Sequence, residues 1–138
     1  MKLRVLTFPL AGLVAATAVT TSRTALPRVP QQAQITAACT PGSTPQVTPA
    51  TVAMARTDIV QWRSVSSGAT SWTITPKDTT DWLFAVDSIT GNPEEPATSP
   101  EPLESAAAGH PYRYMVTITC SDGSSQVIDP DIVIGGGE

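Results

Sequence analysis

The chain has 138 residues, enough for one domain, and its formal net charge at pH 7 is −4. Thirteen prolines and nine glycines interrupt any long helix, and charged residues make up only 14% of the chain. All twelve acids follow residue 25, where five cations oppose them, so this part has a net charge of −7 and argues against nucleic-acid binding.

The first 25 residues have the pattern of a secretory signal peptide. Lys2 and Arg4 are followed by an uncharged, mainly apolar run over residues 5–19, and Ala16-Thr17-Ala18 is a candidate cleavage site. The run is shorter than the roughly 20 residues that span a bilayer. We therefore predict a signal peptide over 1–25, cleaved between about 18 and 33, and an exported protein that is periplasmic, cell-surface or extracellular. An uncleaved membrane anchor and a buried helix are the alternatives.

Residues 26–46 are rich in Thr, Pro and Gln, and we expect them to form an extended lead-in to a domain over 47–138. The chain has two cysteines, and two cysteines in an exported protein predict one disulfide, Cys39–Cys120. The alternative, a metal-ligand role, has little support because the sequence has no CxxC motif and a single histidine.

Apolar and polar residues alternate over much of the remaining chain, and this period of two predicts half-buried β-strands. An Asp-Gly pair at 122–123 predicts a hairpin between the last two predicted strands. The predicted strands cover residues 48–55, 58–64, 70–75, 112–120 and 126–134.

Residues 87–109 form an irregular, proline-rich stretch that we expect to be a solvated acidic loop. A short helical turn near 103–108 and a functional loop are the alternatives. Its acidic residues are Glu94, Glu95, Glu101 and Glu104.

Several short strands separated by turn signals predict an all-β fold, a Greek-key β-sandwich of cupredoxin-like or immunoglobulin-like type. Tryptophans at 62, 72 and 82 are interpreted as one large core residue per strand.

Three motifs resemble those of cupredoxins, the plastocyanin-like fold. Residues 58–62 (DIVQW) resemble the family's G-D-x-V-x-W strand, residues 109–114 (GHPYRY) its G-x-Y-x-Y motif, and residues 132–134 (IVI) its closing strand. The resemblance covers roughly residues 47–134 and implies a secreted protein with this fold.

The copper ligands of that family have no counterparts here. A blue-copper site uses two His, one Cys and a weak axial Met. The position of the first His holds Ser71-Trp72, the position of the Cys holds Val116, and neither His nor Met follows Cys120. The resemblance therefore implies a copper-free protein without a cofactor, although a metal-binding or electron-transfer protein derived from cupredoxins is an alternative.

The sequence offers few candidate residues for other metal-binding or catalytic sites. His110, the only histidine, is expected in an exposed turn, and a calcium site would need Asp122, Asp129 and Asp131 to converge. A small secreted hydrolase would need two rigidly placed carboxylates, whereas the glutamates of 87–109 lie in a proline-rich loop. We predict no catalytic and no metal-binding residues.

The remaining hypothesis is a non-enzymatic structural or interaction module of the cell envelope or exterior. Its partner would be a protein, the envelope or other copies of itself, joined through an exposed β edge. Residues 82–84 are three large apolar residues in a row, so at least one should point outward in a strand. The candidate partner surface is Lys77, Asp81, Trp82 and Phe84. An aromatic platform for glycans is the alternative, formed by Trp72, Trp82, Phe84 and Tyr112.

Overall fold

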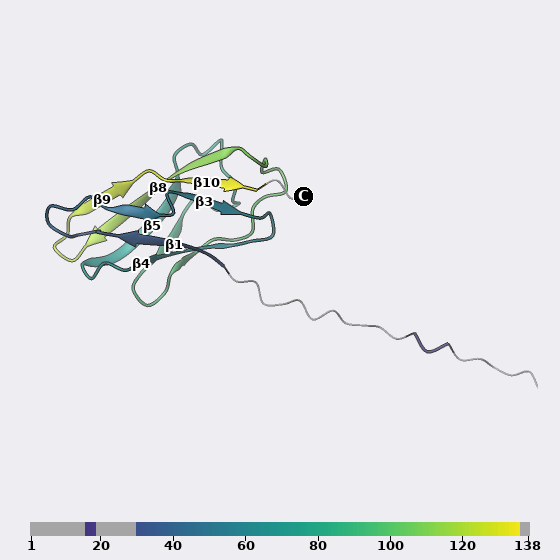
Figure 1. The fold of residues 1–138 in the computed structure, drawn as a ribbon, viewed down its shortest axis with the longest axis horizontal. Helices are drawn as coiled ribbons and strands as arrows, with labels where there is room; N and C mark the ends of the chain where they lie inside the picture. The colour runs from purple at the N-terminus through teal and green to yellow at the C-terminus, as the bar shows by residue number, and fades with distance from the viewer. Residues whose placement is uncertain (1–15, 19–29, 136–138) are drawn as a thin grey trace, which may run out of the picture.

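The computed structural model describes residues 16–18 and 30–135, and these contain β-strands but no α-helix. Most of the predicted signal peptide lies outside the described residues. Within the described residues, no helix is long and apolar enough to cross a membrane. The strands form two layers that pack face to face (Figure 1), which confirms the all-β sandwich.

The smaller sheet has four strands in the order β2-β1-β4-β7. Its centre is parallel, because β1 runs alongside β4, and the other two pairings are antiparallel. The strands are β1 (Gln31–Thr36), β2 (Gln46–Thr48), β4 (Val60–Ser64) and β7 (Ala97–Thr98).

The larger sheet has the order β3-β10-β8-β5-β6, and β9 pairs with β8 beside this path. One edge of the long strand β8 pairs with two strands: residues 111–113 pair with β10, and residues 116–119 pair with β9. In Figure 1, β9 and β10 accordingly lie end to end. The strands are β3 (Thr51–Met54), β5 (Ala69–Pro76), β6 (Ile89–Gly91), β8 (Pro111–Cys120), β9 (Ser125–Ile128) and β10 (Asp131–Ile134).

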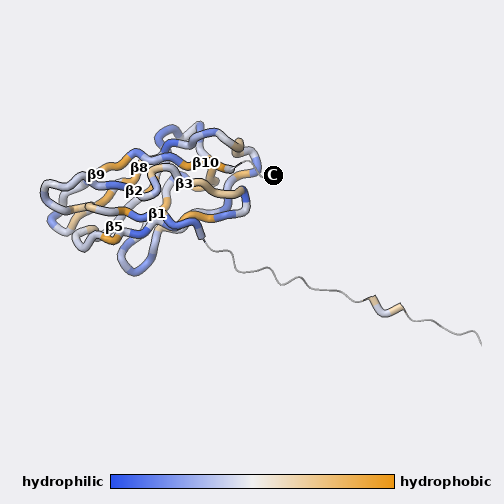
Figure 2. Tube along the Cα trace, viewed as in Figure 1, coloured by the Kyte–Doolittle hydropathy of each residue, from blue (hydrophilic) through white to orange (hydrophobic). Residues whose placement is uncertain are grey.

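The alternating residues of the strands form the core between the sheets. Along β8 every second side chain from Tyr112 to Cys120 is buried, whereas Arg113 and Thr119 are exposed. In Figure 2, hydrophobic segments lie mainly on the strands, and many of the loops are hydrophilic. Burying these rows supplies most of the free energy that holds the layers together.

Three aromatic side chains connect the sheets at the centre of the core. The indole Nε1 of Trp62 in β4 donates to the hydroxyl of Tyr114 in β8 at 3.0 Å, and Nε1 of Trp72 in β5 donates to the carbonyl of Trp62 at 3.0 Å. All three side chains are at most 2% exposed, and burial raises the pKa of Tyr114 well above its ordinary value. A Cβ on Gly91 in β6 would lie 2.6 Å from Nε1 of Trp72, so only glycine lets β6 approach it.

The predicted disulfide Cys39–Cys120 is present, with its Cα atoms 5.6 Å apart. Cys39 follows β1 of the small sheet and Cys120 ends β8 of the large sheet, so the bond links the two layers. A Cβ on Gly68 would lie 2.8 Å from the Cβ of Cys39. Glycine at this position therefore leaves room for the bridge.

The prediction that 26–46 is a lead-in outside the domain is wrong for residues 31–46. Strand β1 is an inner strand of the small sheet, paired with β2 on one side and β4 on the other. Ala33 and Ile35 are fully buried. Strand β1 was not predicted because its sequence is rich in Gln and contains only two residues that face the core. The other residues of the strand are polar and at least partly exposed.

The acidic loop is also less solvated than predicted. Residues 87–109 contain the short strands β6 and β7 and no helix, although the N–H of Ala106 donates to the carbonyl of Leu103 at 3.0 Å and closes a single turn there. The guanidinium of Arg56 donates to the carbonyls of Leu103, Glu104 and Ala106 at 3.2, 3.0 and 2.7 Å. Ala106 is only 5% exposed. The loop packs against the sandwich because Arg56 satisfies carbonyl groups that no strand pairs.

The disulfide closes a loop of 81 sequence positions, which on the chain-entropy model stabilises the fold by about 4 kcal/mol. We predict that replacing both Cys39 and Cys120 with Ala lowers the free energy of unfolding by roughly this amount. Urea unfolding followed by Trp fluorescence measures the change. A loss smaller than about 1 kcal/mol would contradict the assigned role of the bridge.

Tyr114→Phe should lower the free energy of unfolding by about 1–3 kcal/mol, because the buried Nε1 of Trp62 loses its acceptor. Tyr112→Phe is the matched control. It removes the same hydroxyl, but the donor that it leaves is the backbone N–H of the exposed Ala107, which water can satisfy. Equal losses in the two variants, measured by chemical unfolding, would be evidence against this account of the core.

Candidate functional site

The hairpin between β8 and β9 determines which backbone groups of β9 are free. A three-residue turn joins the strands: Gly123, with φ at +88°, donates its N–H to the carbonyl of Cys120 at 3.0 Å. The N–H of Cys120 in turn donates to the carbonyl of Ser124 at 2.8 Å. In an antiparallel ladder hydrogen-bonded pairs alternate, so in this register residues 126 and 128 bond to β8.

It follows that the N–H and C=O groups of Ser125 and Val127 point away from β8. Within the described residues β9 pairs with no other strand. Their side chains are exposed, and Val127 in particular is 56% exposed, which is a high value for an aliphatic residue. Strand β9 therefore presents an open sheet edge together with an apolar side chain.

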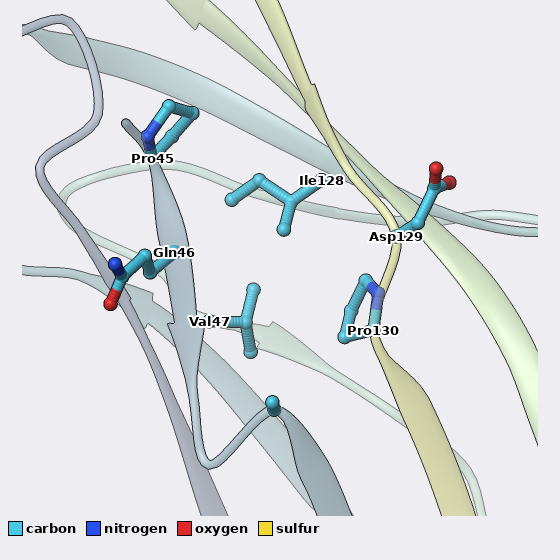
Figure 3. A pocket seen from close by; sticks show the side chains of 7 residues that line it. Pro45, Gln46, Val47, Ile128, Asp129 and Pro130 are labelled. Atoms are coloured by element: carbon cyan, nitrogen blue, oxygen red, sulfur yellow. The ribbon is translucent and has the colours of Figure 1, made fainter. Parts of the chain in front are cut away.

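Two hollows lie beside this edge, and residues 39–50 and 122–130 form the walls of both. We call this region the edge groove. The hollow nearer β10 has a volume of about 190 Å³ and is lined by Pro45, Val47, Ala50, Ile128 and Pro130, with Gln46 and Asp129 beside them. Figure 3 shows the side chains of Val47 and Ile128 directed into the space between β2 and the β9–β10 segment.

The second hollow has a volume of about 240 Å³ and lies near the disulfide. Residues 39–43 face Asp122, Ser124 and Gln126 across it. The side-chain oxygen of Gln126 accepts the N–H of Cys39 at 2.9 Å, which fixes the two walls relative to each other. The edge groove is thus polar at the hairpin end and apolar at the β10 end.

The two outer strands of the small sheet have prolines directly beside them, and proline at an edge hinders pairing with a further strand. Strand β2 is flanked by Pro45 and Pro49, and β7 lies between Pro96 and Pro100. Strand β9 contains neither proline nor charge, and its first neighbouring proline is Pro130, after the strand has ended. The edge of β9, like that of the outer strand β3, is therefore protected by neither proline nor charge within the strand.

The predicted residues Lys77 and Asp81 line a different hollow, of about 390 Å³, together with Asp78, His110 and Arg113. We call it the polar trough. Its charges largely pair with each other or with a neighbour: the Nζ of Lys77 lies 3.5 Å from Asp129, and the Nε2 of His110 lies 2.8 Å from Asp81. These side chains are roughly half exposed, so water weakens the pairs and the trough gives a hydrated, mixed-charge surface.

Of the two aromatic residues in the predicted partner surface, the prediction is wrong for Phe84. Phe84 is only 3% exposed and packs in the core. Trp82 is partly buried, with its ring 5.2 Å from that of Phe84 and its Nε1 donating to the carbonyl of Val86 at 2.9 Å. Residues 82–84 are not a strand, so the alternation expected of a strand does not apply: Leu83 and Phe84 are both buried, and Trp82 is partly buried.

The aromatic platform is wrong for a different reason: Trp72 in β5 and Tyr112 in β8 point into the core and are only 2% and 5% exposed. No three His, Cys, Asp or Glu side chains of residues 16–18 and 30–135 gather to hold a metal ion. Asp129 and Asp131 do line one hollow, next to the polar trough, but Asp122 lies in the hairpin turn, where it accepts two hydrogen bonds from Ser124.

Two glutamates of the acidic loop lie in an exposed turn. Glu94 and Glu95 belong to a turn in which the side-chain oxygen of Asn92 accepts both of their N–H groups, at 2.9 and 2.8 Å. Both residues are exposed, as is Glu104. Reasoning from sequence missed the edge groove, and the signal that could have revealed it is Asp129-Pro130, which breaks one predicted strand into β9 and β10.

Comparison of the chain with protein-family models, with curated proteins and with solved structures finds no match. The interpretation of the edge groove consequently depends on its geometry and chemistry alone.

Two exposed carboxylates give the stability a defined pH dependence. Hydrogen bonds from Ser124 hold the pKa of Asp122 below its ordinary value, and Thr80 does the same for Asp78. A lowered pKa stabilises the fold above the ordinary aspartate pKa of about 3.9, and this contribution is lost as the pH falls through the lower, folded-state value. Asp122→Asn keeps an acceptor but cannot titrate, so its free energy of unfolding should fall less between pH 5 and pH 2, as measured by urea titration. Identical slopes for variant and parent would show that Asp122 makes no such contribution.

Proposed function

We propose that the protein is an exported, non-enzymatic structural or interaction module that accepts an extended peptide strand along β9. The observation that carries the proposal is the pair of unpaired backbone positions, Ser125 and Val127, next to the apolar hollow of the edge groove. Sheet edges of this kind bind extended peptides by main-chain hydrogen bonds, and pockets beside the edge select alternate side chains.

The geometry gives the bound strand a defined pattern. Its backbone groups would bond to those of Ser125 and Val127, and every second side chain would point toward the hollow formed by Val47, Ile128 and Pro130. A hollow of about 190 Å³ suits one aliphatic side chain. Each buried methylene adds about 0.8 kcal/mol, so a β-branched residue at that position favours binding over a polar one.

Two further parts of the proposal depend on the sequence. Export is supported by the signal-like N-terminus and by a disulfide, which persists in oxidising compartments. A copper-free cupredoxin-like fold is supported by the way in which the three motifs enter β4, β8 and β10, where Trp62, Tyr112, Tyr114 and Ile132 are core residues. The proposed partner is a protein, and no cofactor takes part.

The proposal is tested with a synthetic strand donor, the heptapeptide Arg-Thr-Val-Thr-Val-Thr-Arg. We expect it to bind the processed protein with a dissociation constant of roughly 10 µM to 1 mM, as is typical of a small interface. NMR titration of labelled protein should shift the amide signals of Ser125 and Val127 most. The same peptide with alternate amide nitrogens methylated cannot complete the ladder, and its binding should be at least about tenfold weaker.

Val127→Pro removes the outward N–H from β9 at an edge position where proline is tolerated, and it should abolish the peptide shifts. Val127→Thr is the matched control, because it keeps the backbone donor and the branched shape. Retained binding by Val127→Pro, or equal affinity of the methylated and unmethylated peptides, would contradict strand addition at β9.

A further inference from the structure

The chain contains five pairs in which serine or threonine directly precedes proline, and three of these pairs follow one another at intervals of four residues. Proline disfavours the helical conformation in the residue before it, so the backbone of such a segment stays extended. Threonine and serine interspersed with proline are typical of O-glycosylated segments. The three clustered pairs are Thr40-Pro41, Thr44-Pro45 and Thr48-Pro49, and the other two are Thr75-Pro76 and Ser99-Pro100.

The fold leaves the threonines of the clustered pairs accessible. Thr40, Thr44 and Thr48 are all exposed. Among the hydrogen bonds of the described residues, none uses the side-chain hydroxyl of Thr44 or Thr48. The hydroxyl of Thr40, in contrast, donates to the carbonyl of Ala38 at 3.5 Å. Thr44 and Thr48 therefore offer the hydroxyl groups that a modifying enzyme can reach without breaking a bond within the fold.

The position of Thr48 in β2 directs a modification away from the edge groove. Val47 is buried, whereas Thr48 is exposed, and Figure 3 shows the side chain of Val47 directed into the apolar hollow beside Ile128. Neighbouring residues of a strand point to opposite faces, so Thr48 points away from that hollow. Strand β2 is also the outer strand of the small sheet and pairs only with β1. A group attached to Thr48 can thus extend into solvent.

The two remaining pairs are held within the fold. Ser99 is only 4% exposed, and its Oγ accepts the N–H of Val60 at 2.8 Å. Thr75 lies in β5, an inner strand of the large sheet, where it is partly buried and pairs with Met115 of β8. A transferase would have to open the sheet to enclose the backbone at Thr75. The structure therefore distinguishes two accessible acceptors among five pairs of the same chemical type.

We propose that Thr44 and Thr48 are O-glycosylation sites, each of which takes one or more hexoses when the protein is exported. The Oγ1 of the threonine forms a bond to the anomeric carbon of a hexose that is activated as a phosphate ester. The bond between that carbon and the phosphate oxygen breaks, and its electron pair leaves with the phosphate. The hydroxyl proton passes to a base of the transferase. The inference goes beyond strand binding at β9 and shares only export with the proposed function.

Sugars at these two positions protect the outer strand of the small sheet. A glycan is bulky and hydrated, so it hinders the approach of a further strand to β2, as the prolines beside this strand also do. Strand β9 has no Ser/Thr-Pro pair within it or beside it. Glycosylation of Thr44 and Thr48 thus discourages pairing at β2 and leaves the edge of β9 open.

Mass spectrometry of the processed, full-length protein, purified from the organism that exports it, tests the proposal. After reduction, trypsin places the accessible and the inaccessible pairs in different peptides. Thr44 and Thr48 lie in peptide 29–56, Thr75 in peptide 64–77 and Ser99 in peptide 78–113. We expect the added mass of one or more hexose residues on peptide 29–56 alone. Electron-transfer fragmentation should place the sugars on Thr44 and Thr48.

Thr44→Val/Thr48→Val removes both hydroxyls but keeps the branched shape, so it should abolish the added mass on peptide 29–56. Thr44→Ser/Thr48→Ser keeps both hydroxyls and should retain the sugars. Thr75→Val is the matched control, because it removes the hydroxyl of an inaccessible pair and should leave the added mass unchanged. The same chain produced in a host cytoplasm without protein glycosylation gives the unmodified reference mass.

An unmodified peptide 29–56 would overturn the proposal, as would a phosphate in place of the hexose, or sugars found only on Thr40, Thr75 or Ser99. The N-terminus of the purified protein shows which proposal has failed. A chain that has lost its signal peptide but carries no sugar is exported and not glycosylated, whereas a chain that retains Met1 also contradicts export. Titration of the unmodified chain with the heptapeptide Arg-Thr-Val-Thr-Val-Thr-Arg tests strand addition at β9 separately.

Discussion

The hydrogen-bonded contact between Trp62 and Tyr114 is the interaction on which the rest of the sandwich depends. It joins β4 of the small sheet to β8 of the large one, with ring centroids 5.7 Å apart and the rings inclined at 70°. Trp72 extends the contact by donating to the carbonyl of Trp62, which brings in β5. Large aromatic surfaces give the layers apolar area to bury, and their polar atoms find partners without water. No buried side-chain nitrogen or oxygen of the described residues lacks a hydrogen-bond partner.

The edge groove lies at the periphery of the sandwich, where the ends of the strands are held by other contacts than those of the aromatic core. At one end the Cys39–Cys120 bridge holds the β1 and β8 ends together. Further along, Asp129-Pro130 bends the last strand, so β10 continues between β8 and β3 while β9 keeps one open edge. Because the walls of the groove belong to both sheets, the cross-layer contacts hold them in place. A rigid groove loses little entropy when a strand binds.

The polar trough and the edge groove differ in how their charged side chains are paired. In the trough, Lys77 and His110 pair with Asp129 and Asp81, so opposite charges cancel locally. In the groove, no Lys or Arg lines either hollow, and Asp122 lies in the hairpin turn, where only Ser124 donates to it. Unbalanced charge at an open edge favours a cationic strand over a neutral one and discourages association between two acidic edges.

The sequence by itself determined the strands with strict alternation, such as β8, the hairpin at Asp122-Gly123 and the disulfide, because each follows from local periodicity, turn chemistry or cysteine count. The sequence did not predict β1, because only two of its residues are apolar and buried. It also did not predict that Phe84 packs in the core, because this residue lies in a loop and not in a strand. Only the tertiary structure decided which edge stays open. That depends on the order of strands within a sheet, which contacts between residues far apart in the chain decide: β10 pairs with β3 through Asp131 and Thr51, whereas β9 pairs with β8 and with no other strand of the described residues.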